Sequence, residues 1–231
     1  MSSTSLNRLA RSAALAALLL GLSAVHSSAA TLALWTFETT PPLGAGPHVA
    51  DSGVFALTSA ASVNTGGTTD NPVGNGSAES LSSNGWNSGE AFRFNTSSTG
   101  YTDVKLSWSQ TRSSTGPATF DLEYSTDGIS FTTFTNDYTV LQNGLVPNPS
   151  WSSGTPQPVY NFTADLSAVS ALDNAPTLVF RLVSQVSTAA GGTNRVDNFL
   201  VDGTIVPEPA TLALAACGVL GIVFSNRRGR S

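Results

Sequence analysis

Hydrophobic and polar residues alternate along several short stretches of the chain, which is the pattern of strands with one buried face. Within residues 101–110, the apolar side chains of Val104, Leu106 and Trp108 share one face and polar side chains take the other. Similar stretches lie at 32–38, 91–96, 159–163, 177–183 and 195–201. Because long apolar runs of helical period are missing from the middle of the chain, the pattern predicts short strands.

A hairpin is predicted around the dipeptide Asp127-Gly128. Apolar residues at 120, 122 and 124 precede this turn, and Ile129 and Phe131 follow it. Together with turns rich in Gly, Ser and Asn, these strands predict an all-β domain, built as a two-sheet antiparallel sandwich with jelly-roll topology. The long polar segments 62–86 and 142–157 are predicted to be loops.

The N-terminus is typical of a secretory signal peptide. Arg8 and Arg11 precede an apolar run at 13–22, and small residues follow up to Ala30. The run is short for a membrane span, so cleavage after Ala30 is favoured over an uncleaved anchor. The mature chain would then begin at Thr31.

The C-terminal end has three parts in succession: a Pro-Glu-Pro motif, an apolar run at 210–224 and a basic end. The residues of the first and last parts are Pro207, Glu208, Pro209, Arg227, Arg228 and Arg230. The prolines prevent a preceding strand from continuing. A helix of about 15 residues reaches only about 22 Å, against about 30 Å of bilayer hydrocarbon. The basic end should stay cytoplasmic while the middle of the chain is exported.

This tripartite tail resembles the PEP-CTERM sorting signal. The resemblance implies export, transient retention in the inner membrane through the hydrophobic helix, and cleavage by an exosortase in Gram-negative bacteria that make extracellular polysaccharide. The alternative is a permanent single-span anchor. The chain is thus expected to contain a signal peptide at 1–30, a β-sandwich domain at 31–204 and a sorting segment at 205–231.

Without its two ends the chain is strongly acidic. The middle holds 14 acidic and 5 basic residues, a net charge of −9, whereas the whole chain has −5. Such a surface repels phosphate backbones and anionic lipids, so nucleic acid is not an expected partner, and membrane contact is expected only through the C-terminal helix. The lone cysteine, Cys217, lies in the sorting segment. Thiolate metal sites and cysteine nucleophiles are therefore excluded from the domain.

A weaker resemblance concerns the segments 124–131 and 194–203. They are similar to the middle hairpin and the closing strand of extracellular galactose-binding-like jelly rolls, which implies a module that often holds a structural calcium ion and sometimes binds glycans. Glu38, at the end of the first predicted strand, and Asp197, in the last, are the candidate calcium ligands. The alternative is that both are solvated or hydrogen-bonded carboxylates at a sheet edge.

Two tryptophans are candidates for a glycan-binding surface. Trp86 and Trp151 lie in loop-like surroundings rich in Ser, Asn and Gly, whereas Trp35 and Trp108 occupy predicted core positions. An exposed indole can serve as a stacking platform for a sugar ring. The alternative is that both loop tryptophans fold back to cap the sandwich, because tryptophan buries a large apolar area.

The sequence offers two sets of candidate residues for hydrolysis, a carboxylate pair and a single histidine. Asp121 and Glu123 share the polar face of one predicted strand, roughly 7 Å apart by the strand rise, a separation found in inverting glycosidases. Any solvent-facing acidic strand would show the same spacing. A Ser/His/Asp triad would have to use His48, the middle's single histidine, and no Gly-x-Ser-x-Gly elbow lies near it.

These features favour an exported, monomeric and non-catalytic protein of the cell surface or extracellular matrix. Its expected role is structural or adhesive and associated with exopolysaccharide. Two alternatives stay open: a carbohydrate-binding module with structural calcium, and an extracellular glycan hydrolase.

Overall fold

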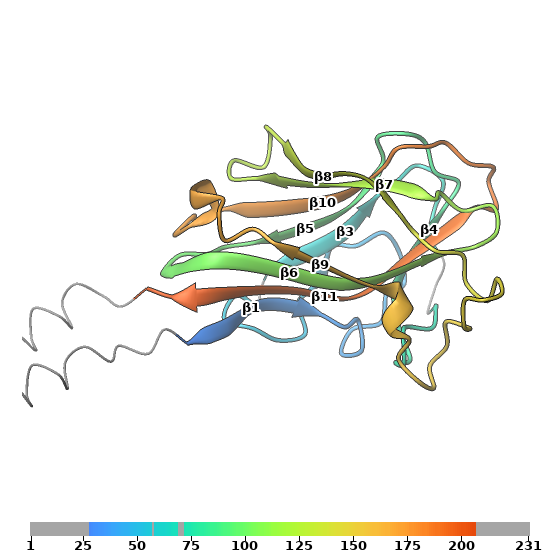
Figure 1. Cartoon of the computed structure of the whole chain (residues 1–231), viewed down its shortest axis with the longest axis horizontal. Helices are drawn as coiled ribbons and strands as arrows, with labels where there is room; N and C mark the ends of the chain where they lie inside the picture. Colours follow the sequence, from blue (N-terminus) through green and yellow to red (C-terminus); the bar gives the residue numbers. More distant parts are fainter. Residues whose placement is uncertain (1–27, 57, 69–71, 207–231) are drawn as a thin grey trace, which may run out of the picture. The chain divides into compact units, whose positions relative to one another are not determined.

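The structure is a computed structural model that describes residues 28–56, 58–68 and 72–206 (Figure 1). The strands are β1 (Ala29–Trp35), β2 (His48–Val49), β3 (Ser59–Val63), β4 (Leu81–Asn84), β5 (Ala91–Thr96), β6 (Tyr101–Arg112), β7 (Thr119–Ser125), β8 (Thr132–Thr139), β9 (Asn161–Asp165), β10 (Leu178–Ser184) and β11 (Thr193–Ile205). The helical elements of these residues are two single turns, η1 (Pro158–Tyr160) and η2 (Ser170–Leu172).

Hydrophobic helices were expected at both ends of the chain, and both fall outside the described residues. Within the described ranges, no helix has the length and apolar character needed to cross a membrane. Residues 29–204 form one compact unit.

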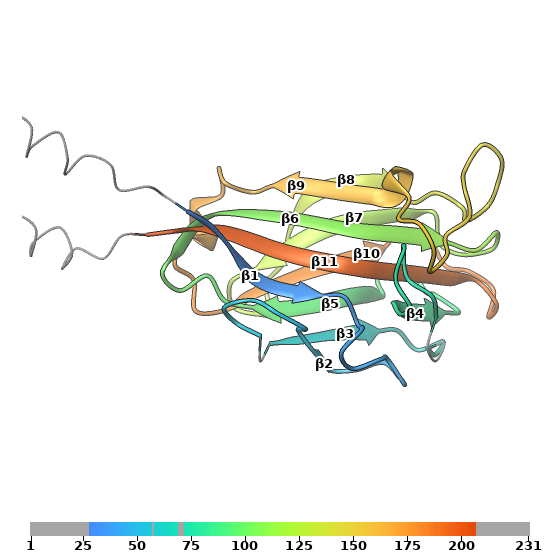
Figure 2. The same cartoon turned by 90° about the horizontal axis from the view of Figure 1, so that it is seen from below.

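The strands form two antiparallel sheets that pack face to face (Figures 1 and 2). Sheet A has the order β1-β11-β6-β9, and β4 pairs with the first part of β11. Sheet B has the order β2-β3-β5-β10-β7-β8. The predicted all-β sandwich is confirmed.

The strand order is that of a jelly roll. When β1 and then β5 to β11 are counted as the first to eighth strands, sheet A follows the order 1-8-3-6 and sheet B the order 2-7-4-5. Each sheet thus interleaves strands from both halves of the chain, as in a pair of Greek keys. The short strands β2, β3 and β4 are additions at the sheet edges.

The core lies between the sheets and follows the alternation of the sequence. Val104, Leu106 and Trp108 of β6 are buried, as predicted. At the centre, the rings of Phe94 and Phe199 stack with their centroids 3.6 Å apart, which joins β5 of sheet B to β11 of sheet A. Burial of such large side chains from both sheets is the main source of stability in a sandwich of this kind.

The predicted hairpin forms, but its second strand starts later than expected. The carboxylate of Asp127 accepts the backbone N–H groups of Ile129 and Ser130, at 2.8 and 2.7 Å. These hydrogen bonds hold the pKa of Asp127 well below its usual range. They also extend the turn, so β8 begins at Thr132. The prediction of a strand at Ile129 was wrong, and this side chain is 84% exposed.

The segment 62–86 was predicted to be a loop, and part of it is strand. Its first residues complete β3, and Leu81–Asn84 forms β4. Neither strand has a clear alternation in the sequence. They form because longer partners supply the hydrogen bonds, β5 for β3 and β11 for β4. The segment 142–157 is a loop, as predicted.

Candidate functional site

Two adjoining cavities lie on the outer face of sheet A, with volumes of about 300 and 320 Å³. Ser107 and Thr163 line both cavities, so we treat them as one hollow and call it the β6–β9 groove. The alternation of its two strands places their polar side chains on this face. These side chains are Lys105, Ser107 and Ser109 from β6, and Asn161, Thr163 and Asp165 from β9.

Asn75 builds one wall of the groove. Its side-chain nitrogen donates to Ser109 Oγ and Asn161 Oδ1, both at 3.2 Å, and its side-chain oxygen accepts the backbone N–H of Gln157 at 2.8 Å. The Asn75 backbone N–H donates to Asp197 Oδ2 at 2.8 Å. The side chain and backbone of this one buried residue therefore tie the loop at 72–80 to β6, β9 and β11.

The middle of the groove carries hydroxyl groups that the protein does not use. Ser107 and Thr163 are directly opposite each other in the β6–β9 register. Within the described residues, neither hydroxyl takes part in a hydrogen bond. Phe162 also lines the groove, half-buried, with its ring stacked against Trp108 at a centroid distance of 5.4 Å. Free hydroxyls suit a ligand that is itself rich in hydroxyls.

One end of the groove carries one cation and two carboxylates, Lys105, Asp165 and Asp202, and so has a net negative charge. Lys105 Nζ lies 2.7 Å from Asp165 Oδ2, and both side chains are mostly exposed. This hydrogen bond and charge raise the pKa of Lys105 and lower the pKa of Asp165. Both groups therefore stay ionised near neutral pH, and the pair adds no net charge to the groove.

Asp197 lies buried behind the wall formed by Asn75. Its Oδ2 accepts the Ser77 hydroxyl at 2.8 Å in addition to the Asn75 N–H, and its Oδ1 accepts the Asn198 N–H at 2.7 Å. Burial raises the pKa of Asp197 to about 6, because desolvation outweighs these hydrogen bonds, and the charge of Glu38 adds to the rise. A Cβ on Gly74 would lie 2.5 Å from Asp197 Oδ2, so the close approach of the loop requires glycine.

The two predicted calcium ligands share no contact within the described residues, although the charge of Glu38 contributes to the raised pKa of Asp197. Glu38 Oε1 also accepts the backbone N–H of Glu79 at 2.7 Å, and Glu79 Oε2 is buried without a hydrogen-bond partner. The unpaired Glu79 oxygen is a ligand of the hard type that calcium prefers, whereas both oxygens of Asp197 already accept hydrogen bonds from the protein. The described residues contain no group of three or more metal-ligating side chains that could hold an ion by themselves.

The expected exposed tryptophan platform is a wrong prediction. Trp86 is fully buried and packs edge to face on Phe92 and Phe120, and its indole nitrogen donates to Ser83 O. Trp151 is 3% exposed, and its indole nitrogen donates to Val73 O at 2.7 Å. Both fold back against the domain, because burying the indole gains more than leaving it in a polar loop: Trp86 joins the core between the sheets, and Trp151 packs on Tyr160.

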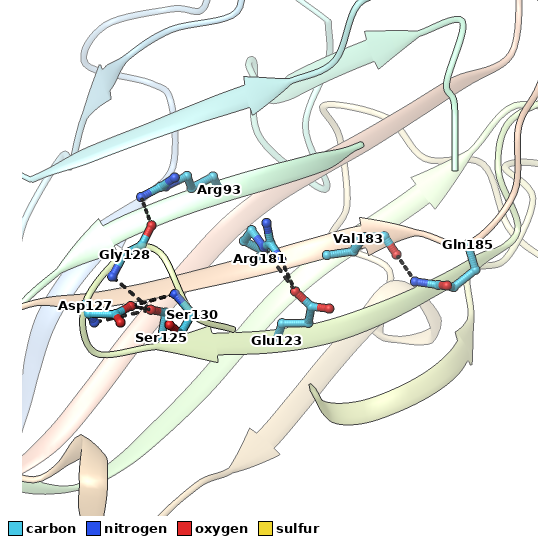
Figure 3. Close-up of polar contacts among 9 residues, drawn as sticks. All are labelled: Arg93, Glu123, Ser125, Asp127, Gly128, Ser130, Arg181, Val183 and Gln185. Atoms are coloured by element: carbon cyan, nitrogen blue, oxygen red, sulfur yellow. Dashed lines mark hydrogen bonds and ion pairs between the residues drawn. The ribbon is translucent and has the colours of Figure 1, made fainter. Parts of the chain in front are cut away.

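The carboxylates considered for hydrolysis are used by the fold. Asp121 accepts the backbone N–H of Asp137 at 2.7 Å, and Glu123 forms an ion pair with Arg181 (Figure 3). They belong to β7 of sheet B, whereas the groove is lined from sheet A. His48 is buried, its ring faces Gly44 O, and burial lowers its pKa. None of these groups lines the groove.

Sequence reasoning missed Asn75 and the polar residues of β9 as site residues. The alternation in 105–109 marked a polar strand face, but that face becomes a groove only beside β9 and under the loop at 72–80. The usable signal was the Asn75-Gly76 pair, a close-turn dipeptide in a segment taken to be a loop.

Comparison with family models identifies the C-terminal end. Residues 206–228 match the PEP-CTERM protein-sorting motif. The chain carries a PEP-CTERM sorting signal. This motif implies export, processing by an exosortase, which is a membrane protein, and sorting at the C-terminus to the cell surface. No curated protein matches the chain.

Two solved structures align with this chain at low similarity. The xylan-binding CBM22-1 domain of Xyn10C from Paenibacillus barcinonensis aligns with a TM-score of 0.43 and 10% identity, covering 79% of this chain and all of that domain. The K2 cleaved adhesin domain of Lys-gingipain aligns with a TM-score of 0.41 and 17% identity, covering 77% of this chain and all of that domain. The jelly-roll assignment itself rests on the strand order described above.

Proposed function

We propose that the domain is a non-catalytic adhesive module that binds a hydroxyl-rich polysaccharide in the β6–β9 groove. The sorting signal delivers it to the cell surface, where exopolysaccharide is the expected polymer. The observation that carries the proposal is the facing pair of unused hydroxyls, Ser107 and Thr163, at the middle of the groove.

The chemistry of the groove supports a polysaccharide rather than a charged or apolar ligand. Its side chains are mainly hydroxyls and amides, which can donate and accept hydrogen bonds with sugar hydroxyls. Asn75 and Asn161 are held by their mutual hydrogen bonds, so the groove is organised before a ligand binds, and less entropy is lost on binding.

Affinity electrophoresis and calorimetry with dextran, galactan and the exopolysaccharide of the native host test this proposal. The double variant Ser107→Ala/Thr163→Ala removes two hydrogen bonds worth about 1 kcal/mol each, so affinity should fall about 30-fold. A matched control is Thr126→Ala/Thr177→Ala, which removes two hydroxyls from exposed positions away from the groove.

The control should bind as the unmodified protein does. Equal binding by both double variants would place the polysaccharide elsewhere on the domain. A domain that binds none of the polymers, including that of its own host, would leave a purely structural role.

We also propose that Glu38 and Asp197 hold a calcium ion that braces the loop at 72–80. The burial of Asp197, the influence of the Glu38 charge on its pKa and the unpaired Glu79 oxygen support this assignment. Millimolar calcium should raise the melting temperature above its value in EDTA, whereas magnesium should do so much less, because it demands a tighter octahedral shell. The variant Asp197→Asn should lose most of the calcium response, and an unchanged melting temperature in the parent protein would refute the assignment.

A further inference from the structure

A small cavity of about 40 Å³ lies on the outer face of sheet A, where β6 ends and β11 begins. Figure 2 shows these two strand ends side by side at the end of the sandwich that carries the loop at 142–157. The cavity is lined by Thr111, Arg112, Ser113, Asn143, Thr193 and Arg195. Two of these residues are arginines and none is acidic, although the middle of the chain has a net charge of −9. The cavity is therefore positive within an acidic domain.

Arg195 has no partner in the part of the chain that the structure describes. Its guanidinium takes part in no ion pair, hydrogen bond or ring contact there. Burial lowers the pKa of Arg195, and no other group offsets this effect. A partly buried charge without a counter-charge or acceptor is unfavourable. The other described arginines, Arg93, Arg112 and Arg181, all donate to oxygen atoms of the protein.

Arg112 is fixed in place on the opposite side of the cavity. Its Nε donates to Val140 O at 3.1 Å, and its Nη1 donates to the carbonyl oxygens of Ser113 and Ser114 at 3.1 and 3.2 Å. The remaining nitrogen, Nη2, has no acceptor among the described residues. Arg112 therefore presents an oriented donor that need not be ordered when a ligand binds.

Asn143 is fixed in the same way. Its Oδ1 accepts the backbone N–H of Trp151 at 2.7 Å, and its own backbone N–H donates to Arg112 O at 2.9 Å. The amide nitrogen Nδ2 has no acceptor within the described ranges. The cavity thus gathers N–H groups of Arg112, Asn143 and Arg195 that make no hydrogen bond within the described residues.

We propose that Arg112, Asn143 and Arg195 bind a small oxyanion, that is, a carboxylate or sulfate group. Guanidinium and amide N–H groups match the oxygens of such an anion, and charge-assisted hydrogen bonds of this type are strong. The cavity of about 40 Å³ is only slightly larger than one water molecule, at about 30 Å³, so it seats one or two oxygens of the anion and leaves the rest of the group in solvent. The anion can be free in solution or a substituent of an acidic polysaccharide. This site is separate from the β6–β9 groove and does not depend on the function proposed for it.

Sodium sulfate is the first probe, with sodium chloride at equal ionic strength as reference. Sulfate stabilises most proteins unspecifically by exclusion from their surfaces, so the decisive readout is saturable binding by calorimetry in the full-length domain. Arg195→Met keeps the length and apolar stem of the side chain and removes the charge. We expect it to weaken sulfate binding at least tenfold and to leave the melting temperature without sulfate unchanged or higher.

Arg93→Met is the matched control, because Arg93 lies on sheet B and is satisfied by Gly128 O. It should bind sulfate as the unmodified domain does. Sulfate binding that is absent, unsaturable or equally strong in Arg195→Met would overturn the site. Ser107→Ala/Thr163→Ala should keep its sulfate binding, which separates this test from that of the groove.

A second arm identifies the source of the anion by comparing digalacturonate with acetate. Tighter binding of digalacturonate than of acetate, lost in Arg195→Met, assigns the site to an acidic polysaccharide. Equal binding of the two, also lost in Arg195→Met, assigns it to a free small anion. If neither binds and sulfate also fails, the proposal is wrong.

Discussion

The two outer faces of the sandwich use their polar side chains in opposite ways. On sheet B, the charged side chains near the turn after β7 all have hydrogen-bond or ion-pair partners within the protein (Figure 3). Arg181 pairs with Glu123, and its guanidinium lies 3.4 Å from the centroid of the Phe131 ring. Arg93 donates to Gly128 O at 3.3 Å and so holds the same turn. These charges stabilise the fold and leave little for a ligand.

On sheet A, several polar groups lack partners in the described chain. The hydroxyls of Ser107 and Thr163 and the guanidinium of Arg195 are unused. Asp197 is hydrogen-bonded yet remains costly as an anion, as its raised pKa shows. The comparison teaches that charges on sheet B are paired within the fold, whereas polar groups on sheet A stay available for the binding proposed above.

Asn75, in the loop beside sheet A, differs from these unpaired groups because its side chain is fully hydrogen-bonded. Its replacement should have the largest effect on stability. Asn75→Ala breaks the side-chain bonds to Ser109, Asn161 and Gln157 and leaves buried groups unpaired, so the free energy of unfolding should fall by about 3 kcal/mol. Urea denaturation measures this change. Asn136→Ala, at an exposed position, is the control and should change little. A loss below about 1 kcal/mol would show that Asn75 does not hold the wall.

The raised pKa of Asp197 predicts that the free energy of unfolding of the domain depends on pH. Its folded pKa of about 6 lies above its ordinary value of 3.8, so between these values the folded state binds more protons than the unfolded state. In EDTA, stability should therefore fall as pH rises from 4 to 6, by about 3 kcal/mol at most. Denaturation at each pH measures this slope. Asp197→Asn should remove it, and an equal slope in that variant would assign it to another group.

Phe131 tests whether sheet B is a purely structural face. Phe131→Ala removes the ring over Arg181 and should lower the free energy of unfolding by about 1 to 2 kcal/mol. Polysaccharide and sulfate binding should not change. Phe134→Ala, three residues along the same hairpin and partly exposed, removes a ring without a cation beneath it and should cost less. Reduced polysaccharide binding by Phe131→Ala would contradict the view that the outer face of sheet B takes no part in binding.

The exposed pair Lys105–Asp165 should give the smallest effect. Because both side chains are mostly in water, Lys105→Met should leave the melting temperature unchanged within error. Polysaccharide affinity should also be insensitive to salt, because the groove centre is neutral. A strong salt dependence of binding would instead indicate an acidic polymer held by Lys105.

Much of the fold could be predicted from the sequence, because its strands bury one face each. The alternation at Val104, Leu106 and Trp108 located β6, and similar patterns located most other long strands. The pattern failed for Leu81–Asn84, where three of four residues are polar. That strand depends on pairing with the start of β11, more than 100 residues later, and local sequence carries no trace of this partner.

The sites could be predicted less well, because they depend on what lies beside a residue. Trp86 and Trp151 sit in polar sequence but are covered by neighbours that only the fold supplies. Arg195 looks like any arginine of a half-exposed strand. What sets Arg195 apart is that no described residue accepts a hydrogen bond from its guanidinium, and this can be seen only in the three-dimensional structure.

The position of β11 has a consequence for the timing of folding during export. This strand contributes Phe199 and Val201 to the core and pairs with β1, the first strand of the domain. Sheet A therefore cannot close until residue 205 has crossed the membrane, and the sorting motif follows at once, at residue 206. Contacts between such distant segments form slowly. The domain can thus complete its core only after the exported chain has been delivered almost up to its sorting motif.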